Sequence, residues 1–220
     1  AMIRSAAQSL PASVGALDRI GAPAKGLPAL EWLLWQPQLD ANQCAYATLL
    51  AEECVAEALA ILDGFQALAQ REWDDENALP FLHEWVGQAV GGLEQLRWKK
   101  IGKPARSARK SDWPRYISGS TRAAWLAQWD GLQRFLLGPA NDAELGSLNG
   151  LLRGRGLLAI SGELERAAVQ VYSTLTTADP ARPVTASAAQ RVLAQTKTLV
   201  EDKAASALQI MVGFSDADGD

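Results

Sequence analysis

The sequence predicts an all-α protein, and three observations support that class. Alanine and leucine dominate the 220 residues, and apolar residues recur at i, i+3 and i+4, the spacing of a helix that buries one face. β-branched residues are sparse, and no hairpin turn lies between alternating runs. Hydrophobic residues make up 48% of the chain and charged residues 21%, which is typical of a globular protein with a sizeable core.

The spacing predicts seven helices, at residues 3–10, 28–36, 42–69, 77–98, 120–137, 142–176 and 186–212. Pro11 ends the first helix. Pro28 opens the second, because the missing N–H of a proline needs no partner at the first helical position. The third carries an apolar stripe, and we expect three of its acids to face water: Glu52, Glu53 and Glu57.

The second half of the chain predicts a helical bundle. The basic segment 97–110 is interpreted as a solvated linker. Gly138-Pro139 stops one helix, and glycines within 153–156 predict an interruption in the next. Four long helices are enough for a C-terminal four-helix bundle at residues 75–220. Residues 1–74 then hold the remainder of an N-terminal bundle.

Charge and hydropathy exclude several classes of partner. The net charge is −4 and the isoelectric point is about 5.2, which argues against a general nucleic-acid or membrane-surface binder. No segment reaches the roughly 20 apolar residues that a membrane-spanning helix needs. No signal peptide is recognisable in the chain.

The sequence offers few residues for catalysis or metal binding. Cys44 and Cys54 would lie about 15 Å apart along one helix, too far for a disulfide, and both are interpreted as small buried hydrophobes. His83 is the one histidine and is expected on a helix surface or at the edge of the core. A serine or cysteine triad would need it as its base. We therefore expect no catalytic residue, no metal and no cofactor.

Four segments, in order, resemble those of the imelysin-like family, once classed as peptidase M75. "KGLPALEWLLW" (25–35) is similar to the family's first motif, and "QCAYATLLAEECVAEALAIL" (43–62) to the helix after it. "YISGSTRAAWLAQWDGLQRFLLG" (116–138) resembles the family's Arg-Ser-Gly-x-Ser segment and its helix. "VGFSDADGD" (212–220) resembles the family's closing turn. Family members usually carry further helices before the first motif, so this chain resembles an N-terminally shortened member.

The family's hallmark, Gly-x-His-x-x-Glu, is altered here. Its histidine and glutamate lie at i and i+3, on one face of a helix, where they could share a metal ion. In this chain Gly26 and Glu31 match the motif, and Pro28 stands in place of the histidine. Because proline has no side-chain donor or acceptor, the sequence predicts that the family's metal site is lost.

Glu31 has two interpretations. In the first turn after Pro28, its carboxylate would meet the positive end of the helix dipole, worth about 0.3–1 kcal/mol. Alternatively, it is a retained polar anchor in the family's cleft. Ser118 and Ser120 carry a similar choice between a helix N-cap and a cleft.

The resemblance implies a ligand cleft and a location. The acidic end of the chain, "DADGD" (216–220), resembles the start of an EF-hand calcium loop, but the sequence stops before the ligands that such a loop needs further on. It is therefore interpreted as a C-terminal turn whose acids cap helices or line that cleft. The expected cleft residues are Lys25, Gly26, Glu31, Arg115, Ser118, Ser120 and Asp218. Members are lipoprotein-like or periplasmic proteins of the bacterial cell envelope that are implicated in iron uptake. The expected function is therefore non-enzymatic binding of a small ligand or an envelope protein. The alternatives are a metallopeptidase and an interaction module completed by another chain.

The second and third helices yield expectations about burial. Trp32, Leu33 and Leu34 are expected to be buried, with Glu31 pointing toward the N-terminal end of its helix. The helix 42–69 has an apolar stripe with few residues nearby to cover it.

We predict that this stripe is covered either by a second copy of the chain, giving a homodimer, or by a further N-terminal segment. Light scattering of the purified chain across a concentration series tests the first option and should give twice the monomer mass. A monomer at every concentration, with the helix covered by its own chain, would contradict the prediction that residues 1–74 are an incomplete bundle.

Overall fold

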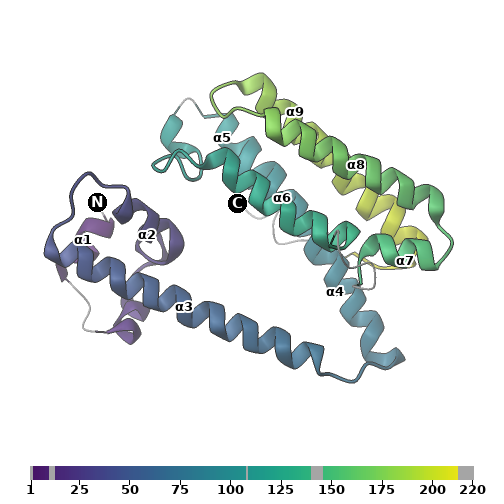
Figure 1. The fold of residues 1–220 in the computed structure, drawn as a ribbon, viewed down its shortest axis with the longest axis horizontal. Helices are drawn as coiled ribbons and strands as arrows, with labels where there is room; N and C mark the ends of the chain where they lie inside the picture. Colours follow the sequence, from purple (N-terminus) through teal and green to yellow (C-terminus); the bar gives the residue numbers. More distant parts are fainter. Residues whose placement is uncertain (1, 10–12, 108, 140–145, 213–220) are drawn as a thin grey trace. The chain divides into compact units, whose positions relative to one another are not determined.

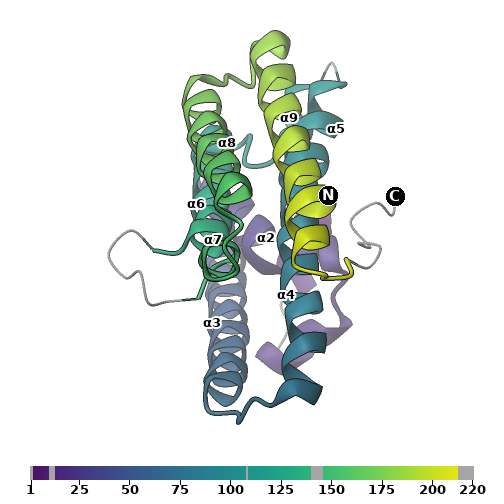
Figure 2. The same cartoon turned by 90° about the vertical axis from the view of Figure 1, so that its right-hand side faces the viewer.

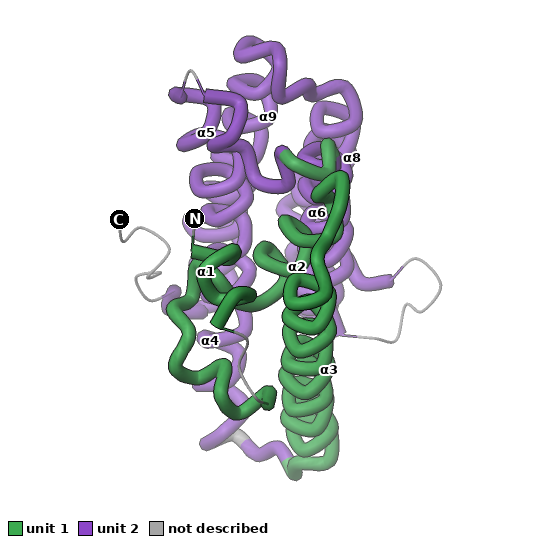
Figure 3. Tube along the Cα trace, turned by 90° about the vertical axis from the view of Figure 1, so that its left-hand side faces the viewer, with its two compact units in different colours: residues 1–72, 117–119 green, residues 73–116, 120–220 purple. Residues whose placement is uncertain are grey.

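A computed structural model describes residues 2–9, 13–107, 109–139 and 146–212, and these contain helices and no strand. The all-α class is thus confirmed. The chain divides into two compact units (Figure 1, Figure 3). Unit 1 holds residues 1–72 and 117–119, and unit 2 holds residues 73–116 and 120–220.

Unit 1 is built on one long helix. Its elements are α1 (Met2–Ser9), the 3-10 turns η1 (Val14–Arg19) and η2 (Ala22–Ala24), α2 (Gly26–Leu34) and α3 (Ala41–Ala69). An Asp40–Gln43 capping box starts α3, so two backbone N–H groups at this end are satisfied. Both α1 and α2 pack against α3. The core between them is closed by the fully buried Leu17, Leu33 and Leu50.

Unit 2 is a four-helix arrangement with short additions. Its elements are α4 (Asp75–Glu94), the π-helical η3 (Gln95–Gly102), α5 (Lys103–Ala105), η4 (Lys110–Asp112), α6 (Thr121–Leu137), α7 (Leu148–Gly154), α8 (Leu158–Thr177), α9 (Pro183–Thr198) and the π-helical η5 (Leu199–Ala205). Contacts join α4 to α6, α6 to α8, α8 to α9 and α9 back to α4 (Figure 2). Trp125 and Trp129 are buried inside this ring.

The linker interpretation of residues 97–110 is wrong for its first half. There α4 continues through η3 into α5, and Leu96 and Ile101 are fully buried. A Cβ on Gly102 would lie 2.5 Å from the Gln190 side chain, so this glycine lets α9 approach closely. The basic residues hid these inward-facing apolar positions. The predicted interruption within 153–156 is confirmed, since α7 ends at Gly154 and α8 begins at Leu158.

Two burial expectations in unit 1 are wrong. Leu33 is buried as expected, but Trp32 is only partly buried and Leu34 is 57% exposed, because α2 is an amphipathic helix with one face on α3. Cys44 is exposed and Cys54 is half-buried, so neither is the core residue that we expected. Neither cysteine is in a disulfide.

The apolar face of α3 continues beyond the core of unit 1. Ile61 lies about three turns after the buried Leu50 on the same face, and Phe65 and Leu68 follow it. Phe65 is 66% exposed, and Ile61 is exposed to a similar degree. Further exposed apolar residues of α3 are Val55, Leu59 and Leu62. This exposure fits the argument for an uncovered stripe, and the homodimer stays a prediction.

The contrast between Leu33 and Leu34 gives a paired stability test. Leu33→Ala should lower the free energy of unfolding by about 2–5 kcal/mol, because it leaves a cavity in the core. Leu34→Ala should change it by less than about 0.5 kcal/mol. Urea unfolding followed by circular dichroism measures both, and equal effects would show that α2 does not pack as described.

Candidate functional site

Gly26 sets where α2 begins and therefore where Glu31 points. Its φ of 66° lies in the left-handed region, which a residue with a Cβ enters only at a cost. The helix starts at this glycine, two residues before Pro28, so Glu31 lies in the second turn. The helix-dipole interpretation of Glu31 is therefore wrong, since no acid lies in the first turn of α2.

Glu31 is instead a buried hydrogen-bond acceptor. The residue is 9% exposed, and its Oε1 accepts a hydrogen bond from the Ser118 hydroxyl. Ser118 lies 87 residues later in the chain, in the short 117–119 segment that belongs to unit 1. The contact joins two of the segments in which expected cleft residues lie. Sequence reasoning named both residues but did not predict that they touch.

Not all of the expected cleft residues are part of unit 1. Arg115 and Ser120 belong to unit 2, where the Ser120 N–H donates to the Arg115 carbonyl over 3.2 Å. Ser120 occupies the N-cap position of α6, although its side chain makes no capping hydrogen bond. Asp218 lies outside the described residues. Lys25, Gly26, Glu31 and Ser118 are the expected cleft residues that belong to unit 1, and of these the structure brings Glu31 and Ser118 together.

A second polar group in unit 1 is centred on Glu53. The Lys25 ammonium lies 2.6 Å from Glu53 Oε1. The Tyr46 hydroxyl donates to the Ala24 carbonyl over 2.7 Å, next to Lys25. The expectation that Glu53 faces water is wrong, because this residue is only 7% exposed. Tyr46, Leu50 and Glu53 lie on the buried face of α3, which packs against the other helices of unit 1.

Charge and burial shift the pKa values in this group. The hydrogen bond to Glu53 raises the pKa of Lys25, burial opposes it, and the charges of Glu53, Asp18 and Glu57 raise it further. Burial raises the pKa of Tyr46, and the charge of Glu53 adds to this. The Lys25 side chain is therefore a cation at neutral pH and the Tyr46 side chain a neutral hydroxyl.

The Cys54 thiol lies in the same electrostatic field. Burial raises its pKa, and the charges of Glu57 and Glu53 act in the same direction. A thiol shifted upward from its usual range is protonated at neutral pH and is a poor nucleophile. These properties are those of a structural cysteine rather than a catalytic one.

The residues present do not fit the metal pair of the family motif. Pro28 has no side-chain ligand, and Glu31 is engaged by Ser118. His83 lies on α4, in unit 2. Within the described ranges, no three histidine, cysteine or acidic side chains are grouped so that they could hold a metal ion.

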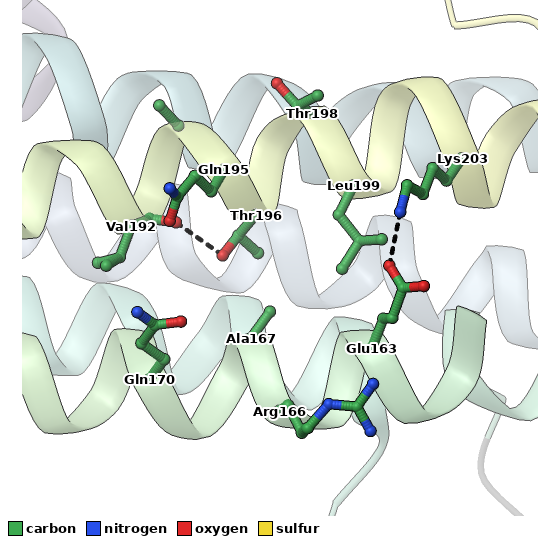
Figure 4. Close-up of a pocket in the computed structure, with 11 residues that line it drawn as sticks. Glu163, Arg166, Ala167, Gln170, Val192, Gln195, Thr196, Thr198, Leu199 and Lys203 are labelled. Carbon is green, nitrogen blue, oxygen red and sulfur yellow. Dashed lines mark hydrogen bonds and ion pairs between the residues drawn. The ribbon is translucent and has the colours of Figure 1, made fainter. Parts of the chain in front are cut away.

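Unit 2 carries a separate groove of about 520 Å³ along α8, α9 and η5 (Figure 4). A Lys203–Glu163 ion pair of 2.7 Å closes one end. Gln170 and Gln195 lie toward the other end, with Leu199 between. Sequence reasoning did not find this groove, because its polar residues are spaced like those of any exposed helix face.

Comparison with known proteins establishes the class. The family model for imelysin, Peptidase M75, matches residues 2–213, and the chain belongs to this family. The crystal structure of an imelysin-like protein from Psychrobacter arcticum 273-4, at 2.15 Å resolution, has the same fold, with a TM-score of 0.75 and 22% sequence identity. The match covers 96% of this chain and 68% of that one. No curated protein matches the chain.

The resemblance of the four sequence segments to the imelysin-like family is thus confirmed. The fold that it implied is also confirmed, at the level of an all-α imelysin-like architecture. In the described part of the chain, no helix is both long enough and apolar enough to cross a bilayer.

The altered motif gives a direct metal-binding test. Calorimetric titration with iron, zinc and copper salts should reveal no stoichiometric site tighter than about micromolar, which corresponds to about −8.2 kcal/mol, because Pro28 removes a ligand. Glu31→Ala is the matched variant. A one-to-one site that this variant abolishes would show that Glu31 ligates a metal without the histidine.

Proposed function

We propose that this member of the imelysin family is a non-enzymatic binding or accessory protein of the bacterial cell envelope that takes part in iron uptake. The observation that supports a binding role is the contact between Glu31 and Ser118. Burying a carboxylate is costly unless it is hydrogen-bonded, so the chain holds this acid at the motif position by a specific contact. The envelope location and the link to iron rest on the family resemblance.

The proposed ligand-binding residues within unit 1 are Lys25, Gly26, Glu31 and Ser118. They supply an ammonium, the backbone of a residue without a side chain, a carboxylate and a hydroxyl. Such groups recognise a polar ligand by hydrogen bonds and charge. Arg115, Ser120 and Asp218 stay in the proposal on the family resemblance alone.

A second candidate is an interaction module completed by another chain. The exposed apolar residues of α3, including Ile61 and Phe65, favour it, because such a surface on a folded protein is usually covered by a partner. For the metallopeptidase alternative, no observation on the described residues adds support, since the motif histidine is replaced by Pro28.

Growth under iron limitation tests the proposed function. Deleting the gene in its host should lower growth when an iron chelator is present, and the wild-type gene should restore it. Glu31→Gln and Ser118→Ala should each fail to restore growth, because the first removes the charge of the carboxylate and the second removes the hydroxyl donor of the contact. Glu52→Gln is the matched control, since Glu52 is an exposed acid on α3.

Cell fractionation in the same strains tests the location. The protein should be recovered with periplasmic or membrane-associated envelope proteins. A cytoplasmic protein whose deletion leaves iron-limited growth unchanged would contradict the proposal.

A further inference from the structure

The groove along α8, α9 and η5 in unit 2 has the size and lining of a small-molecule site (Figure 4). Its volume of about 520 Å³ lies within the range of known ligand pockets, which are mostly apolar with a few polar groups. The buried Thr196 and Leu199 form its floor, whereas Gln170, Gln195 and Thr198 at its rim are exposed. A ligand can therefore enter this groove directly from solvent.

The groove is an apolar strip with different polar groups at its two ends. On the α8 side it is lined by Glu163, Arg166, Ala167 and Gln170, which share one helix face because they recur at i, i+3, i+4 and i+7. This wall runs for about 10.5 Å along the helix axis. Leu199 lies across from Ala167, between the charged end and the amide end. A ligand that fills the groove is therefore elongated and apolar in its middle.

Arg166 is a cation whose neighbouring acids are bound to other residues. The Lys203 ammonium lies 2.7 Å from Glu163 Oε2, across the groove. An Arg153 guanidinium nitrogen lies 2.8 Å from Glu165 Oε1. Among the described residues, the Arg166 side chain makes no ion pair or hydrogen bond, and the residue is exposed. Its N–H donors are therefore available to a ligand.

The guanidinium lies at the charged end of the groove. A Cβ on Gly162 would lie 3.4 Å from one of the Arg166 guanidinium nitrogens, so this side chain extends back along α8. Figure 4 shows it toward the Glu163 end and away from Gln170. Two of the charged lining residues, Arg166 and Lys203, are cations and only Glu163 is an acid. The excess of positive charge at this end favours an anion.

We propose that this groove binds an apolar carboxylate, a molecule with a hydrocarbon chain and one terminal carboxylate. The carboxylate accepts hydrogen bonds from the Arg166 guanidinium, whose planar fork matches two carboxylate oxygens. The hydrocarbon chain lies over Ala167 and Leu199. A small inorganic anion would leave the apolar strip uncovered, and a neutral hydrocarbon would leave the guanidinium unused. The site lies in unit 2 and does not depend on the Glu31–Ser118 contact or on the role in iron uptake.

Nuclear magnetic resonance titration of the full chain with sodium octanoate tests the proposal. The side-chain NH₂ signals of Gln170 and Gln195 should shift with one-to-one saturation. 1-Octanol lacks the charge, octylammonium has the opposite charge and acetate lacks the chain, so each should bind at least about threefold more weakly. Equal binding of 1-octanol or octylammonium would overturn the carboxylate assignment, and equal binding of acetate would overturn the role of the apolar strip.

Arg166→Gln removes the proposed cation at an exposed position, so the variant should fold. It should weaken octanoate binding about three- to tenfold, because it removes a charge-assisted hydrogen bond. The matched control is Arg191→Gln, which alters an exposed arginine of α9 that does not line the groove and should bind like the wild type. Unchanged affinity in Arg166→Gln, or no saturable binding by the wild type, would overturn the proposal.

Two further variants test the location of the site. Ala167→Leu fills the middle of the groove and should weaken octanoate binding at least about tenfold, with circular dichroism as the check on folding. Full binding by a folded Ala167→Leu variant would place octanoate elsewhere and overturn the proposal. Glu31→Gln should keep octanoate binding, so failure of this proposal and failure of the proposed function are separable.

Discussion

The ion pair between Lys25 and Glu53 is the interaction on which the arrangement of unit 1 depends. It holds the residue before α2 against the middle of α3, and the Tyr46–Ala24 hydrogen bond holds the preceding turn to the same helix. Gly26 follows directly, and its left-handed backbone starts α2 at that point. The start of α2 fixes which face carries Glu31, and so brings its carboxylate to Ser118.

Unit 2 depends on a different constraint, the close packing of α9 on η3. Gly102 allows this approach. At the end of α4, the buried Glu94 accepts a hydrogen bond from Arg97, whose Nε lies 2.8 Å from Oε2. The π-helical segment η3 directly continues α4, and the π-helical segment η5 directly continues α9. Such segments shift the register of the residues that follow, which lets Leu96 and Ile101 both point into the core.

The sequence was sufficient for the fold class, the helix 120–137 and the long helix 42–69, because each has a strong apolar period and clear end signals. It was insufficient where a tertiary contact reverses a local preference. Glu53 has the polar neighbours of a surface acid, yet its partner Lys25 lies in another element. The start of α2 was misplaced because the positive φ of Gly26 competes with the signal of Pro28. Burial of Glu31 by Ser118 could not be read from spacing, since 87 residues separate them.

That separation has a consequence for how the chain reaches its folded state. Unit 1 is assembled from residues at the start of the chain and a three-residue segment, 117–119, taken from the middle of the part that forms unit 2 (Figure 3). Closing a loop of this length costs about 4 kcal/mol of chain entropy. At about 5–20 residues per second, synthesis delivers Ser118 several seconds after Glu31. The N-terminal helices can therefore pair early, while the contact at the motif glutamate is among the late, non-local steps of folding.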